Sequence, residues 1–87
     1  MSIVQQFDEL VEIAQQLGYK IRYDYFGGTG GGVCEYGGTK WLFIDLGMST
    51  VDRLEKLQTI LSIEPLLDTL RLSPQRQQLL GLGSRAA

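Results

Sequence analysis

The sequence predicts a small α+β domain in the order α-β-β-β-α-α, with a three-stranded, mostly antiparallel sheet packed against helices. Three observations favour this class. Apolar residues recur at helical spacing over residues 3–17, and they alternate with polar residues over 19–25. Two short β-type runs then flank a Gly-Gly pair, and helical spacing returns after residue 49. The length fits one domain, expected over residues 1–80, with a flexible tail over 81–87.

The first helix is predicted over residues 3–17, where apolar side chains form one stripe and glutamines and acids fill the other face. Ser2 can cap its start, and Gly18 can end it in a left-handed conformation. The period then changes to two. Tyrosines and an isoleucine of residues 19–25 alternate with Lys20 and Arg22, which indicates a strand with one solvated face.

A hairpin is predicted from residues 33–36 and 40–46, with Gly37 and Gly38 as the central residues of a primed turn. This turn would fix the register, in which the opposed pairs are Tyr36 and Thr39, Glu35 and Lys40, Cys34 and Trp41, and Val33 and Leu42. The opposite charges of Glu35 and Lys40 suit a cross-strand pair.

The second strand of this hairpin is apolar on both faces, because Trp41, Leu42, Phe43 and Ile44 follow one another. Such a strand is normally central and covered on both sides. The helices can supply one cover. The other must come from the C-terminal helical segment or from another subunit.

A second helix should begin at Ser49, because Ser49 and Asp52 form a plausible capping box, and it should run to about Ser62. Pro65 can end this helix or begin another short one.

A last short helix is predicted over residues 74–80, because Ser73 followed by Pro74 has the chemistry of a helix start. The C-terminal part of the chain is rich in leucine, at positions 66, 67, 70, 72, 79, 80 and 82. Cover within the chain and contact with a second subunit explain these leucines equally well.

Four segments in residues 3–61 follow a known order: Leu17-Gly18 leading into a strand, a hairpin containing residues 32–38, the apolar run from Trp41 to Asp45, and a helix starting at Ser49. This order resembles the core of zinc-dependent peptidases of the ImmA/IrrE type, within the wider zincin class. In that family the Ser-capped helix carries His-Glu-x-x-His.

The helix that matches lacks this motif. It reads Leu54-Glu55-Lys56-Leu57-Gln58-Thr59, and the chain contains no histidine. Zinc peptidase activity needs metal ligands and a general base, so no catalytic residue carries over. The resemblance therefore implies a degenerate, non-catalytic relative used for binding or assembly. We expect no metal centre and no cofactor.

The glycine-rich loop over residues 27–32 is one candidate ligand site. Backbone N–H groups near Gly28, Thr29, Gly30 and Gly31 could hold an anion. A flexible strand connector is favoured, because the spacing fits neither common phosphate-loop motif and a β-type run follows.

Three carboxylates, of Asp24, Glu35 and Asp45, are candidates for acid–base chemistry. Asp45 is the most interesting, since it ends an apolar strand near a helix start, although hydrogen bonds to backbone N–H groups of residues 47–50 are the favoured explanation. Cys34 lacks a histidine base, so a small buried hydrophobe is favoured over a nucleophile.

Composition limits the partners. A net charge of −2 and a pI near 4.9 give no general field for nucleic acid or an anionic membrane. No apolar stretch approaches the ~20 residues that span a bilayer. The single cysteine and the absence of signal-peptide features at the start favour the cytoplasm.

We therefore expect a non-enzymatic domain for protein binding or self-association, acting as a homo-oligomer or with a protein partner. The expected interface residues are Trp41, Phe43, Leu66, Leu67, Leu70 and Leu79. The alternative is a small-ligand (anion) binding or carboxylate-based catalytic domain that uses the Gly27–Gly32 loop with Asp24, Asp45 or Thr29.

Overall fold

A computed structural model describes residues 2–28 and 31–81 and confirms a small α+β fold with a three-stranded sheet. In chain order the elements are α1 (Ile3–Gln16), β1 (Tyr19–Asp24), β2 (Gly32–Tyr36), β3 (Thr39–Asp45), α2 (Thr50–Ser62), the 3₁₀ helix η1 (Pro65–Thr69) and α3 (Pro74–Leu79). Apart from Gly81, the tail predicted over 81–87 lies outside the described residues.

The sheet has the strand order β1-β3-β2, so the apolar strand β3 is central, as predicted. β2 runs antiparallel to β3, whereas β1 runs parallel to it. The sheet is therefore mixed rather than mostly antiparallel. The reason is that β1 and β2 lie on opposite sides of β3, so residues 25–31 connect the end of β1, beside Asp45, to the start of β2, beside Phe43. A tight turn there would have made β1 and β2 direct antiparallel neighbours.

The hairpin register is the predicted one, with Val33 opposite Leu42, Cys34 opposite Trp41 and Glu35 opposite Lys40. Gly37 and Gly38 both have positive φ angles, of 60° and 79°. A type I′ turn requires this conformation at both central residues, and its twist matches that of the strands. The Gly-Gly pair therefore sets which side chains share each face of the sheet.

Side-chain caps fix the helix starts where the sequence placed them. Ser2 and Gln5 form a capping box on α1, Ser49 Oγ accepts from the N–H of Asp52, and Ser73 Oγ accepts from the N–H of Arg76. Each cap satisfies an N–H group that has no partner within the helix. At the other end of α1, Gly18 turns the chain into β1 with a φ of +93°.

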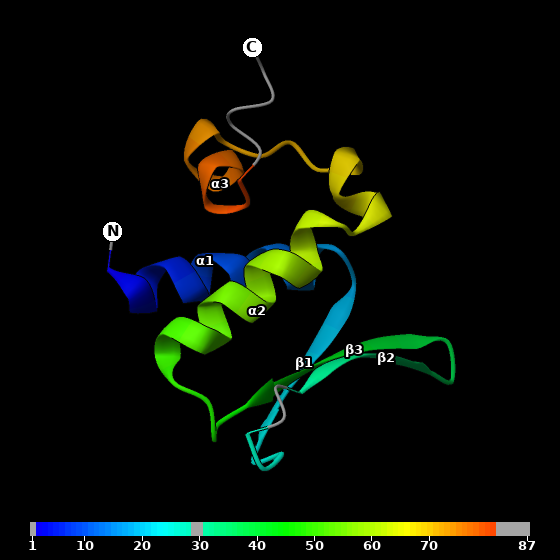
Figure 1. Cartoon of the computed structure of the whole chain (residues 1–87). Helices are drawn as coiled ribbons and strands as arrows, with labels where there is room; N and C mark the ends of the chain where they lie inside the picture. The colour runs from blue at the N-terminus through cyan, green and yellow to red at the C-terminus, as the bar shows by residue number, and fades with distance from the viewer. Residues whose placement is uncertain (1, 29–30, 82–87) are drawn as a thin grey trace.

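The elements form three layers, with the sheet at one side, α1 and α2 on one of its faces, and the C-terminal segment beyond these helices (Figure 1). The core lies between the sheet and the helices. Its largest fully buried apolar side chains are Leu10, Ile13, Leu42 and Leu61.

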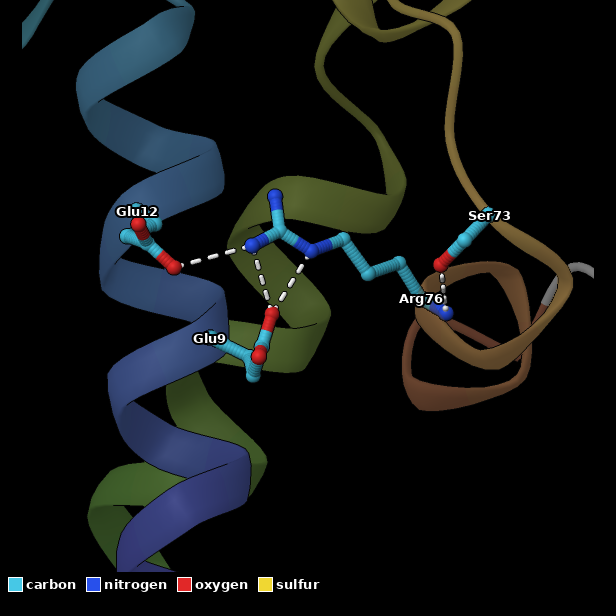
Figure 2. A network of polar contacts seen from close by, with 4 residues as sticks. All are labelled: Glu9, Glu12, Ser73 and Arg76. Atoms are coloured by element: carbon cyan, nitrogen blue, oxygen red, sulfur yellow. Dashed lines mark hydrogen bonds and ion pairs between the residues drawn. The ribbon is translucent and has the colours of Figure 1, made fainter.

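The C-terminal segment does not cover the second face of the sheet, which corrects one of the two predicted placements. Leu67 and Leu80 are each 5% exposed and complete the core on the helical side. Arg76 is 2.6 Å from Glu9 Oε2 and 2.9 Å from Glu12 Oε2, both on α1 (Figure 2). Apolar burial and this ion pair together hold the segment against α1.

Candidate functional site

The sheet face that points away from α1 and α2 is the candidate site, and we call it the open face. Its side chains are those of Lys20, Arg22, Cys34, Tyr36, Trp41 and Phe43. Along β3 the side chains alternate, so Leu42 and Ile44 enter the core while Trp41 and Phe43 lie on the open face, half-buried. No described helix lies over it (Figure 1).

Aromatic rings form the centre of the open face. The rings of Trp41 and Phe43 are stacked, with centroids 6.2 Å apart and an interplanar angle of 18°. Phe26, in the loop after β1, meets Phe43 edge-on at 5.6 Å. These contacts hold the rings in a fixed arrangement, which lowers the entropy lost when a partner covers them.

Positive charge lies along the β1 side of the open face. Lys20 Nζ is 5.8 Å from the centroid of the Trp41 ring, within reach of a cation–π interaction. The exposed Arg22 guanidinium is 3.7 Å from Asp24 Oδ2. Aromatic and arginine side chains are enriched in the centres of protein interfaces.

The β2 side of the open face is hollowed. Arg22, Cys34, Tyr36, Trp41 and Phe43 surround a shallow depression of about 330 Å³. A second depression, of about 260 Å³, is lined by Phe26, Val33 and Phe43 and by the small residues Gly31 and Gly32. At these two positions β2 carries glycine and cysteine, whereas β3 carries the aromatic rings of Phe43 and Trp41.

Cys34 is exposed, which corrects the expectation of a buried small hydrophobe. It sits opposite Trp41, as the register required, but on the side of the sheet that no described element covers. No histidine exists in the chain to act as a base, and no group of three or more potential metal ligands occurs among residues 2–28 and 31–81.

Asp45, whose side chain is 1% exposed, lies where the chain leaves β1 toward the glycine-rich loop. Asp45 Oδ1 accepts hydrogen bonds from the N–H of Gly47 at 2.8 Å and from the N–H of Phe26 at 3.0 Å. The bond from Gly47 is the structural hydrogen bond that the sequence favoured. The bond from Phe26 holds the segment after β1 at the end of β3. The Asp45 carboxylate and the N–H of Gly28 both lie close to Gly47, and a negative charge so near disfavours an anion there.

Two residues of the loop site, Thr29 and Gly30, lie outside the described part of the chain. Gly31 is held by packing: a Cβ at this position would lie 2.2 Å from the Phe43 carbonyl oxygen, and its φ is +60°. This glycine is needed for close backbone approach to β3. Of the other candidate carboxylates, Asp24 contacts Arg22, and Glu35 is exposed on β2.

A polar cluster joins the sheet to the start of η1, and the sequence did not predict it. Glu64 accepts from Lys40 Nζ at 2.8 Å and from the Tyr19 hydroxyl at 3.0 Å, and Lys40 Nζ lies 4.5 Å from the Tyr19 ring centroid. The register placed Lys40 beside Glu35, but its 2.8 Å ion pair is with Glu64. Sequence spacing carries no signal for a contact between residues so far apart.

This cluster shifts two pKa values. Burial, followed by the hydrogen bond to Glu64, raises the pKa of Tyr19 to about 12. The hydrogen bond from Lys40 is the main cause that lowers the pKa of Glu64 below its usual value. All three groups are satisfied by one another, as expected for a structural cluster rather than for a site that waits for a substrate.

The leucines predicted for an interface are divided between core and surface. Leu67 is buried, Leu70 and Leu79 are partly buried against the core, and Leu66 is 48% exposed. Cover within the chain therefore accounts for most of them. Of the six predicted interface residues, Trp41 and Phe43 share the open face, and the four leucines belong to the C-terminal segment, which lies on the helical side of the sheet.

Comparison with protein-family models, with curated proteins and with solved structures gave no significant match to this chain. Within the described residues, no helix combines the length and the apolar character needed to cross a lipid bilayer.

Proposed function

We propose that this chain is a non-enzymatic self-association module that docks through the open face. The observation that carries the proposal is the stacked pair Trp41 and Phe43, on the central strand of the sheet, with no described element over it. The strand β3 is apolar on both faces, and the helices cover only one of these faces. A second copy supplies the missing cover.

The size of the open face sets the expected strength. Three strands about 4.8 Å apart and five to seven residues long give a flat footprint of roughly 300 Å² per copy. If the protruding side chains double this area, it still remains below the ~800 Å² per partner of a standard interface. We therefore expect a weak dimer that dissociates on dilution through the micromolar range.

Light scattering over a dilution series from about 1 mM to about 1 µM tests the proposal. The mass should approach twice 9.7 kDa at the high end and fall to 9.7 kDa at the low end. Trp41→Thr keeps a β-favouring residue on the strand but removes the ring, and it should stay monomeric throughout. Ile63→Thr is the control, because Ile63 is 77% exposed after the end of α2, away from the open face.

Circular dichroism of each variant verifies that the fold is retained. A wild-type mass of 9.7 kDa at every concentration contradicts the proposal. So does a dimer that Trp41→Thr leaves intact. Equal loss of the dimer in Ile63→Thr would place the contact elsewhere.

Kinship with ImmA/IrrE-type zincins stays a prediction of the order of elements. It is compatible with the proposal, because α2, which matches the helix that carries His-Glu-x-x-His in that family, packs here through Leu54, Leu57 and Leu61 and has no histidine. Packing and assembly are the roles left to such a relative.

A further inference from the structure

The open face has a relief that runs across the strands. At one level the side chains from β1 to β2 are Lys20, Trp41 and Cys34. At the next level they are Arg22 and Phe43, followed by Gly32, which has no side chain. The β1 side is thus high at both levels, the centre is aromatic, and the β2 side is low.

The two depressions described above reach this low side: one extends from Arg22 across the aromatic centre to Cys34, and the other lies against Gly32. At the third level, that of Tyr36 and Thr39, the β2 side is the high one. Tyr36, which pairs with Thr39, is large, and β1 offers no paired residue there because its ladder with β3 begins at Tyr19 and Lys40. At all three levels, therefore, one edge of the open face is high and the other is low.

A surface with this relief complements itself under one particular rotation. A two-fold axis parallel to β3 and lying between two facing sheets keeps the level of each residue and exchanges the two edges. The β1 edge of one copy then faces the β2 edge of the other at the same level. Each contact is isologous, as closed dimers require.

We infer that the occupant of the open face is a second copy of this chain, related by a two-fold axis along β3. Lys20 of each copy then lies over Cys34 of the other, and Arg22 lies over Gly32. The long basic side chains fill the two depressions and meet the aromatic rings that line them. The depressions are complete only when the partner contributes these residues.

Charge is compatible with this arrangement. Each basic pair lies at one edge, so the rotation places the two pairs at opposite edges of the dimer, about two strand spacings apart, or roughly 10 Å. At that separation screening by physiological salt weakens their repulsion. If two β1 strands faced each other instead, Lys20 and Arg22 of both copies would share one edge, with unfavourable charge.

A bump placed in the depression tests the orientation. Cys34→Phe fills the space above an exposed residue, so it should abolish the homodimer while the fold is retained. Phenylalanine favours strands, and Trp41 remains the only tryptophan. The bump should be relieved in trans by Lys20→Ala, because the shortened residue of one copy then lies over the introduced phenylalanine ring of the other.

The assay is fluorescence anisotropy of Cys34→Phe, labelled at its N-terminus and titrated with unlabelled partners. Lys20→Ala should bind at least about tenfold more tightly than wild type, which corresponds to relief of one overpacked contact. Lys56→Ala removes an exposed lysine of α2, on the helical side of the sheet rather than on the open face, and should bind no better than wild type.

This inference rests on the proposed self-association, and the two can fail separately. A wild-type chain that stays monomeric refutes both. A wild-type dimer whose Cys34→Phe variant gains nothing from Lys20→Ala refutes the orientation alone. If Cys34→Gly is the partner that restores binding, β2 faces β2, and the axis lies across the strands instead.

Discussion

Glu64→Gln is the perturbation that most directly tests how the structure assigns the partner of Lys40. Glu64 accepts from Lys40 at 2.8 Å and from the Tyr19 hydroxyl at 3.0 Å. Glu35 faces Lys40 across the hairpin and is the partner that spacing alone predicts. Glu35→Gln makes the same change of charge and is therefore the matched control.

The expected cost follows from burial. The side chains of Lys40 and Glu64 are 25% and 12% exposed, so the pair lies between a surface ion pair, worth about 0–1 kcal/mol, and a buried one, whose disruption costs about 3–5 kcal/mol. We expect Glu64→Gln to lower the free energy of unfolding by about 2 kcal/mol. In a domain of this length that lowers Tm by about 10 °C. Glu35→Gln should stay within about 0.5 kcal/mol.

The same cluster predicts how stability depends on pH. The pKa of Tyr19 is raised to about 12. Its contribution to the free energy of unfolding is therefore complete below about pH 10, where the phenol of the unfolded chain is still protonated. It is lost as pH rises through 12, and the total loss should approach about 2–3 kcal/mol, since a tenfold change in an acid dissociation constant corresponds to about 1.4 kcal/mol. The pKa of Glu64 is lowered, so its contribution is present above about pH 4.3 and is lost as pH falls through the native value.

Urea unfolding at pH 7 and at pH 11 measures the onset of the alkaline loss, and urea unfolding at pH 3 measures the acidic loss. Absorbance of tyrosinate near 295 nm follows the phenol directly. Tyr19→Phe identifies which of the four tyrosines titrates last. In Glu64→Gln the pKa of Tyr19 should fall but stay above 10, because burial is the larger cause. If Glu35→Gln costs as much as Glu64→Gln, the assignment of the Lys40 partner is wrong.

Two further predictions concern the loop between β1 and β2. Gly31→Ala should destabilise the fold by about 1–3 kcal/mol or more, because its Cβ would overlap the Phe43 carbonyl. Gly28→Ala, at a similar φ but with open space around it, should cost about 1 kcal/mol. Thermal melts compare the two variants, and equal costs would contradict the packing explanation. Asp45→Ala should cost about 1–3 kcal/mol, because the part-buried hydrogen bonds from the N–H groups of Phe26 and Gly47 are lost. Added phosphate should not raise the wild-type Tm, and a phosphate-dependent rise would revive an anion site at the loop.

The local structure could be predicted from sequence because each feature depends on residues a few positions apart. Ser2, Ser49 and Ser73 cap helices whose first turns they adjoin. Gly37 and Gly38 fix a register in which every confirmed pair lies within about ten residues along the chain. These features follow from the conformational and hydrogen-bonding preferences of short segments, which packing did not override here.

The parts that failed depend on contacts between distant segments. The edge that β1 takes depends on its parallel ladder with β3, from Tyr19 to Asp24, which no spacing encodes. The ion pairs of Arg76 with Glu9 and Glu12 join the two ends of the described chain (Figure 2). Glu64 likewise replaced Glu35 as the partner of Lys40, because the start of η1 lies beside the sheet.

The position of the C-terminal segment determines what remains for the open face. A segment with both apolar leucines and a cation gains more on the helical side, where Glu9 and Glu12 meet Arg76 and the core accepts Leu67 and Leu80. On the open face the same segment would set Arg76 beside Lys20 and Arg22, with like charges and no acidic partner except Asp24. Electrostatics and burial thus favour the helical side for the C-terminal segment. The aromatic centre of the open face is left without cover from the described part of the chain. Under the proposed self-association, that cover is a second copy of the open face, high where this one is low.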